Sequence, residues 1–345
     1  MSALVYPSSH PTSLNSILYQ DPAAHIEDFL FTHSANDLVS GSESTVRSLS
    51  ICAGSLRQVP VRIFENLSHL GIFLGRDMEN ITLVFRYAGR LESLSILGLE
   101  DHAIFPLLED HPNSLPSLRS FKILSPYGGW QLHLDVGETQ FLSLAHFLCG
   151  KKELRALDIH MWTEGWSSLA PLWDLLKQLP SLEVLGITTG IGVFAREDFL
   201  SFAAALPPKL SALRVNSQWD IGEGEENDGC STLVRAFCPL FVVCARSNCR
   251  ATLQIEALDK ISFFYMRNYK YSFAFLSDEI TRELPSVKIL GLDQVMSYIF
   301  RDGDGGVEVQ DWSARRCFTR TVEDFDGNED WEWLMRYHDL GEWAW

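Results

Sequence analysis

Oxygen-bearing side chains with the spacing of a calcium loop lie near the C-terminus. They alternate along the chain as Asp324, Asp326, Asn328 and Asp330. An EF-hand loop starting at Asp324 would also need a glycine at its sixth position and a glutamate at its twelfth. Glu329 and Met335 stand there instead, so the sequence does not predict an EF-hand.

Four cysteines form a second group of candidate ligands: Cys230, Cys238, Cys244 and Cys249. None of them forms the closely spaced pair, about two to four residues apart, that structural zinc sites use. The chain has seven cysteines, an odd number, and most lie in apolar runs. This usage is typical of free thiols in a reducing compartment. We therefore expect no metal ion, no cofactor and a cytoplasmic or nuclear protein.

Motifs for nucleophilic catalysis are missing from the sequence. There is no G-x-S-x-G elbow, no phosphate-binding G-x-x-x-x-G-K and no H-E-x-x-H pair. His146 lies on the apolar stripe of an expected helix, where a packed histidine is more common than a ligand. We predict that the chain is not an enzyme. A hydrolase built from dispersed carboxylates is an alternative that the sequence leaves open.

The charge balance restricts the partners. The formal net charge is −17, from 45 acidic and 28 basic side chains. Such a surface repels the phosphates of nucleic acids and anionic lipids. No apolar stretch approaches the roughly 18 residues of a membrane span, and residues 1–13 do not resemble a secretory signal. We expect a neutral or basic protein partner, no nucleic acid and no membrane.

A repeated apolar pattern organises the middle of the chain. It reads apolar, two variable, apolar, two variable, apolar, one variable, apolar, and the clearest copies are LPSLRSFKI, LPSLEVLGI and LPSVKILGL. The third apolar position serves as a marker for each copy, and the markers are Leu49, Leu70, Leu94, Phe121, Leu157, Leu185, Leu213, Ile261 and Leu290. Most spacings fall in or near the period of about 20 to 29 residues that leucine-rich repeats show. The gaps from Phe121 to Leu157 and from Leu213 to Ile261 are longer.

Each copy predicts one strand followed by one helix. The last two apolar positions alternate with variable ones, as in a strand with one buried face. Apolar residues at helical spacing follow over 141–148 and 169–176. One such unit cannot bury its apolar side alone, but stacked units can. We predict an α/β leucine-rich-repeat solenoid, a horseshoe with a curved parallel sheet on its concave face and helices on its convex face. An ordinary α/β domain is the alternative.

The LPSL-x-x-L-x-I phrases resemble the repeat region of F-box proteins, especially the divergent sets of mushroom-forming fungi. The resemblance covers residues 45–295 and implies a substrate-recognition subunit of an SCF-type ubiquitin ligase, with the ligase adaptor as a partner. Residues 1–44 carry no recognisable F-box, and HIEDFL is their nearest apolar helical stretch. The chain could therefore be a fragment of a longer F-box protein.

Three segments follow from this pattern. Residues 1–44 are expected to form an N-terminal cap or a partly disordered segment. Residues 45–295 form the solenoid, with an acidic loop near 221–230. Residues 296–345 are acidic and rich in tryptophan, and we expect them to fold back as a C-terminal cap, with WEWLMRYHDL as a short helix. An acidic and aromatic peptide that docks on a partner is the alternative for this end of the chain.

The predicted function is binding of a protein partner on the concave face, without catalysis. Variable residues beside the strand apolars point to that face. The residues chosen as partner contacts are Lys122, Asp158, His160, Trp162, Arg214, Asn216, Phe264 and Asp293. The ubiquitin-ligase subunit and the enzyme are the alternative functions.

Overall fold

The computed structural model describes residues 46–74, 78, 80–98, 102–124, 136–161, 166–191, 201–202, 204–218, 260–268, 277, 280–281, 284–292, 295–303, 306–312 and 330–335. The chain divides into two compact units. The first comprises residues 1–134, 146–154 and 337–345, and the second comprises residues 135–145 and 155–336.

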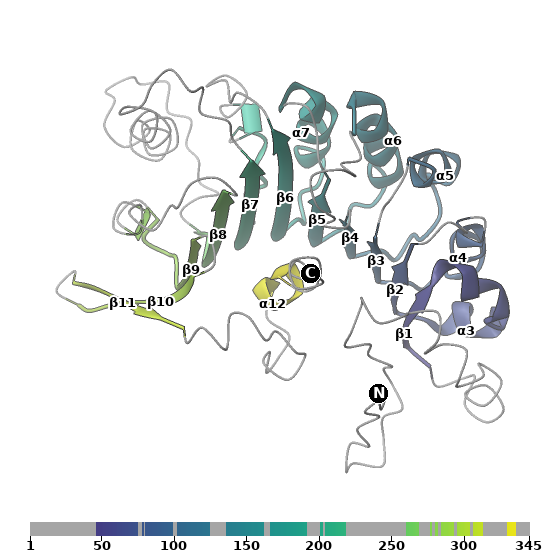
Figure 1. Ribbon diagram of the computed structural model, residues 1–345, viewed down its shortest axis with the longest axis horizontal. Coiled ribbons are helices and arrows are strands. Elements are labelled where there is room, and N and C mark those ends of the chain that lie inside the picture. Colours follow the sequence, from purple (N-terminus) through teal and green to yellow (C-terminus); the bar gives the residue numbers. More distant parts are fainter. Residues whose placement is uncertain are drawn as a thin grey trace, which may run out of the picture. The chain divides into compact units, whose positions relative to one another are not determined.

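The first unit alternates parallel strands with short helices (Figure 1). Its strands are β1 (Ser48–Cys52), β2 (His69–Phe73), β3 (Ser93–Leu97) and β4 (Ser120–Leu124). They pair in chain order. Between them lie the 3-10 helix η1 (Ala53–Gln58) and the helices α3 (Val61–Asn66), α4 (Ile81–Tyr87) and α5 (Ile104–Asp110).

The strand registers in this unit follow the apolar repeat. Leu49 pairs with Leu70, Leu70 with Leu94, and Leu94 with Phe121. Leu70, Leu94 and Phe121 are buried. Equivalent positions of successive copies therefore stack side by side, as the marker residues predict.

Lys151 stands at the first apolar position of the copy whose marker is Leu157. Lys151 is only 4% exposed. Its Nζ donates a hydrogen bond of 3.0 Å to the Pro112 carbonyl and lies 4.1 Å from the centre of the Phe147 ring. Burial lowers the pKa of Lys151 from 10.5 to about 8, because the charged ammonium loses hydration there.

The second unit continues the same alternation. Its parallel strands are β5 (Ala156–His160), β6 (Val184–Ile191), β7 (Ala212–Gln218), β8 (Phe263–Asn268) and β9 (Ile289–Leu292). These pair in chain order. The strands β10 (Val295–Arg301) and β11 (Val307–Asp311) follow as antiparallel additions. The 3-10 helix η2 (Trp166–Leu169) and the helix α7 (Ala170–Leu176) connect β5 to β6, and α6 (Glu138–Leu148) precedes β5.

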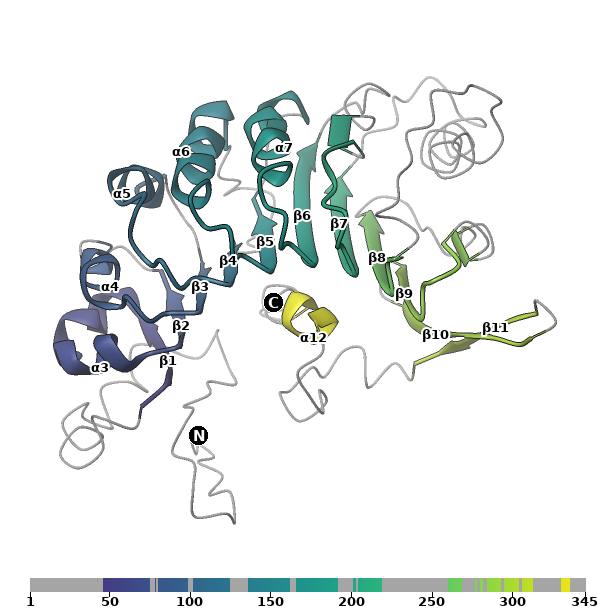
Figure 2. The ribbon, with the colours of Figure 1, turned by 180° about the vertical axis from the view of Figure 1, so that it is seen from behind.

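The core row of the second unit is made of Leu157, Leu185, Leu213, Phe264 and Leu290, which are matched in register and buried. The short helix α12 (Asp330–Met335) lies on the opposite side of the sheet from α7, as both views show (Figures 1 and 2). The prediction of an α/β fold with parallel strands in chain order, alternating with helices in a solenoid-like arrangement, is confirmed within each unit.

Candidate protein-binding face

The side of the second unit's sheet that carries α12 is the candidate site, and we call it the α12 face. Alternation along a strand places every second residue on it. Its first row, at the strand starts, contains Ala156, Val184, Ala212, Phe263 and Ile289. Its second row contains Asp158, Gly186, Arg214, Tyr265 and Gly291, and its third row begins with His160, Thr188 and Asn216.

The helix α12 packs on the apolar first row. Leu334 and Met335 are 0% and 2% exposed, and both belong to one buried cluster with the first-row side chains. The small side chains of Ala156 and Ala212 leave room for the helix on either side of Val184. The same cluster includes Tyr265 of the second row and Met296 of β10.

Behind this contact lies a buried polar cluster. Arg214 donates a hydrogen bond of 2.7 Å to the Asp158 carboxylate, and both side chains are fully buried. A second guanidinium nitrogen of Arg214 donates to the Thr188 hydroxyl at 3.3 Å. Thr188 also lies 2.5 Å from Nδ1 of His160. The Thr188 hydroxyl can therefore accept from Arg214 while it donates to His160.

Gly186 makes the ion pair possible. Asp158 and Arg214 belong to β5 and β7, and Gly186 lies between them on β6 in the same row. A Cβ atom at Gly186 would overlap the Asp158 carboxylate and would lie 2.7 Å from Cδ1 of Leu334. The absent side chain thus provides the space through which Arg214 reaches Asp158 and on which Leu334 rests.

A second glycine of the second row, Gly291, also makes space for larger side chains. A Cβ atom at Gly291 of β9 would overlap the Tyr265 ring from the neighbouring strand and would lie 2.7 Å from Sδ of Met296. Two glycines in one row therefore let larger side chains from adjacent strands lie flat on the sheet.

The geometry suits a structural ion pair better than a reactive one. Two charges without solvent contact are stable only when each is well paired. Asp158 and Arg214 meet this requirement across one strand. Among the described residues, the face offers a packed surface and not a set of solvent-accessible acid–base groups.

Partly exposed aromatic side chains border the α12 face, and we call them the aromatic rim: Tyr298, Phe300, Trp312 and Trp333. The Tyr298 ring centre lies 5.1 Å from that of Trp312 and 6.2 Å from that of Phe300. Tyr298, Trp312 and Trp333 pack against the buried cluster. Phe300 is 49% exposed, and it shares a face of β10 with Met296 and Tyr298 because strand side chains alternate.

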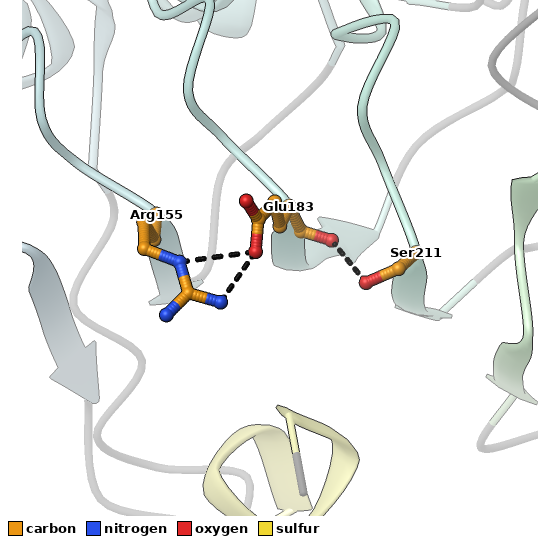
Figure 3. A network of polar contacts seen from close by, with 3 residues as sticks. All are labelled: Arg155, Glu183 and Ser211. Atoms are coloured by element: carbon orange, nitrogen blue, oxygen red, sulfur yellow. Dashed lines mark hydrogen bonds and ion pairs between the residues drawn. The ribbon is translucent and has the colours of Figure 1, made fainter.

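A polar network joins the starts of three strands (Figure 3). Nε of Arg155 donates to the Glu183 carboxylate at 3.0 Å, and the Ser211 hydroxyl donates to the Glu183 carbonyl at 3.1 Å. The side chains of Arg155 and Glu183 are 53% and 31% exposed. An ion pair this accessible contributes little to stability, about 0 to 1 kcal/mol.

The structure brings four of the predicted contact residues together. Asp158, His160, Arg214 and Asn216 lie on the α12 face, and each is at most 3% exposed. Lys122 belongs to β4 of the first unit and is 1% exposed. Trp162 and Asp293 lie outside the described residues, as do residues 1–44 and the acidic loop near 221–230.

The predicted place of Phe264 is wrong. The sequence pattern puts it on the partner face, but its register with Leu213 and Leu290 puts it in the core row. Phe263 and Tyr265 occupy the α12 face instead. The marker of this copy is therefore Phe264 and not Ile261, because β8 is offset by three residues from the predicted register.

Sequence reasoning missed the aromatic rim. It predicted that residues 296–345 fold back as a cap, but it did not predict which strands the helix α12 would contact. Residues from β10, β11 and their surroundings follow the last copy of the repeat, so the pattern gives them no position on a face. The apolar triplet Trp333, Leu334 and Met335 inside an acidic segment is the signal that could have identified the contacting side chains of that helix.

The described ranges contain neither a cluster of metal ligands nor a membrane-spanning helix. No group of three or more histidine, cysteine or carboxylate side chains there could hold a metal ion. The cysteines from Cys230 to Cys249 and the residues Asp324, Asp326 and Asn328 lie outside those ranges. No helix within them has the length and apolar character needed to cross a bilayer.

Comparisons with known proteins give little guidance to the family. No family model matches this chain, and no curated protein is significantly similar to it. One similar solved structure is the tropomodulin C-terminal domain from Caenorhabditis elegans, which is 11% identical. The match covers 48% of this chain and 84% of that one, with a TM-score of 0.28. A similarity of this size shows neither a family nor a function.

Proposed function

We propose that this chain is a leucine-rich-repeat protein that binds a protein partner without catalysing a reaction, and that the α12 face is its binding surface. The repeat assignment is supported by the matched registers of the marker positions in each unit. A regular leucine, isoleucine or phenylalanine at the same strand position in successive copies is what stacked repeats require.

The observation that carries the binding proposal is the seating of α12. A sheet face that buries Leu334 and Met335 completely has the shape and apolarity to hold a helix. Recognition of an amphipathic helix by an apolar surface is a common mode of peptide binding. The face therefore already performs, within the chain, the kind of contact that we assign to it.

The aromatic rim supplies anchors next to that seat. Aromatic side chains dominate the energetics of protein interfaces, because they bury much area at low entropic cost. Phe300 leaves half of its surface in water, on the same side of β10 as Met296. The net charge of −17 favours a partner with a neutral or basic contact surface.

The test is affinity capture from a native lysate with the full-length chain, comparing two variants of one hairpin. Phe300→Lys removes an anchor from the α12 face. Val309→Lys changes a residue that is 38% exposed and pairs with Ile299, so it faces the other side. Both positions are exposed, so neither change should unfold the chain. We expect a set of proteins that the wild type and the Val309→Lys variant capture and the Phe300→Lys variant does not. Identical captured sets from all three would reject this surface.

A further inference from the structure

Few side chains carry the described contact between α12 and the sheet. The helix has six residues, and Leu334 and Met335 are its fully buried side chains within the described part. Most helical stability in proteins comes from packing of an apolar face, so α12 relies on its seat. An element held this way can exchange with a better ligand.

The seat itself is specific in shape. It combines the small first-row residues Ala156 and Ala212 with Gly186 beneath Leu334. Met335 adds a flexible thioether side chain, a type that adapts well to irregular apolar surfaces. These features fit a short helix that presents consecutive leucine and methionine side chains.

The position of the aromatic rim points in the same direction. Trp333 of α12 and Tyr298 of β10 pack against one cluster. Phe300, whose ring centre lies 6.2 Å from that of Tyr298, is 49% exposed. A ligand that covers both the exposed Phe300 and the apolar seat has to take the place of α12.

We propose that α12 occupies the binding site of the partner. The partner presents a short amphipathic helix with a Leu-Met pair, and this helix displaces α12 from the seat formed by Ala156, Val184, Gly186 and Ala212. The proposal rests on the proposed function and names the kind of partner and the regulation of the same surface. Because α12 belongs to the same chain, it competes with the partner intramolecularly, and the partner has to overcome this competition. The chain therefore binds fully only partners that outcompete its own helix.

The test uses a dye-labelled synthetic peptide of residues 326–340, DGNEDWEWLMRYHDL, and fluorescence polarisation with full-length chains. Leu334→Asp in the chain releases its own helix, because a carboxylate cannot enter the apolar seat. We expect the peptide to bind this variant with a dissociation constant at least tenfold lower than that for the wild type. Adding Ala212→Asp to the same chain should abolish binding, and a peptide carrying Leu334→Asp should not bind either.

Cooperative thermal unfolding of each variant controls for folding. If Leu334→Asp or Ala212→Asp fails this control, Leu334→Ala or Ala212→Leu replaces it, with an expected threefold gain or loss of peptide affinity. Equal affinity of the peptide for the wild-type and released chains would overturn the proposal. A concentration-dependent dimer of the wild type would overturn it too, since α12 of a second copy would then be the occupant.

The outcomes separate this inference from the proposed function. Unlabelled peptide should reduce capture of the Phe300-dependent partner at least fivefold. If the peptide binds the released chain but leaves capture unchanged, the partner does not use the seat, and this inference fails while the proposed function stands. If the peptide behaves as expected and no captured protein depends on Phe300, the proposed function fails while the seat remains.

Discussion

Gly186→Ala is the substitution that probes the buried centre of the α12 face most sharply. The added methyl group would overlap the Asp158 carboxylate and would lie 2.7 Å from Cδ1 of Leu334. The carboxylate therefore has to move away from Arg214, and the Leu334 side chain has to shift as well. Breaking a buried ion pair costs about 3 to 5 kcal/mol, and exposing a buried leucine costs about 1.5 to 3 kcal/mol. We therefore expect a loss of about 3 kcal/mol or more in the free energy of unfolding.

The assay is urea denaturation followed by circular dichroism, with Gly150→Ala as the matched control. A Cβ atom at Gly150 meets nothing within 4 Å, so its effect should stay within about 0.5 kcal/mol. The cost of Gly186→Ala should shrink by about 1 kcal/mol or more in an Asp158→Ala background, because the obstructing carboxylate is then gone. An effect no larger than that of Gly150→Ala, or one unchanged by Asp158→Ala, would refute the reasoning.

Three further predictions concern buried side chains within each of the two units. Between about pH 8 and 10.5, the unfolded chain holds a proton on Lys151 that the folded chain has lost. The free energy of unfolding of the wild type therefore rises with pH in this range. Lys151→Met should remove this rise. Urea midpoints across this range check it, with Lys152→Met at the exposed neighbouring position as the control. Arg214→Met should cost about 3 to 5 kcal/mol by leaving the Asp158 charge buried and unpaired, and adding Asp158→Leu should restore most of that loss in the same denaturation assay. Phe264→Ala should cost about 3 to 5 kcal/mol, as expected for a core phenylalanine; a loss below about 1 kcal/mol would mean that it does not lie in the core row.

The periodicity of the sequence was enough to predict the parallel strands β1 to β9 and their order, but not β10 and β11. Marker residues such as Leu94, Phe121, Leu185 and Leu213 are apolar at a regular spacing, and a strand with one buried face imposes that pattern. The register of β8 could not be predicted in the same way. Phe263 and Phe264 are adjacent and both apolar, so alternation does not tell which one faces the core. The pairing with Leu213 and Leu290 decides it.

The sequence predicts which side of the sheet carries Asp158 and Arg214, but it does not predict that both side chains are buried. Asp158 and Arg214 stand at variable strand positions, and the structure does place both on the predicted side of the sheet. Asp158 and Arg214 can be buried because each charge pairs with the other and because Gly186 leaves space for the pair. That ion pair spans two repeats, and Leu334 comes from a helix far along the chain. Contacts so distant in sequence leave no local signal in the repeat pattern.

Hydrogen exchange of the full-length chain, measured with and without a captured partner, shows whether a partner binds the α12 face and displaces α12. We expect that the partner slows exchange in β10 around Phe300 and in β5–β7. We also expect that the partner speeds exchange at residues 330–335, because α12 leaves its seat. Protection confined to other parts of the chain, with exchange at 330–335 unchanged, would contradict both expectations.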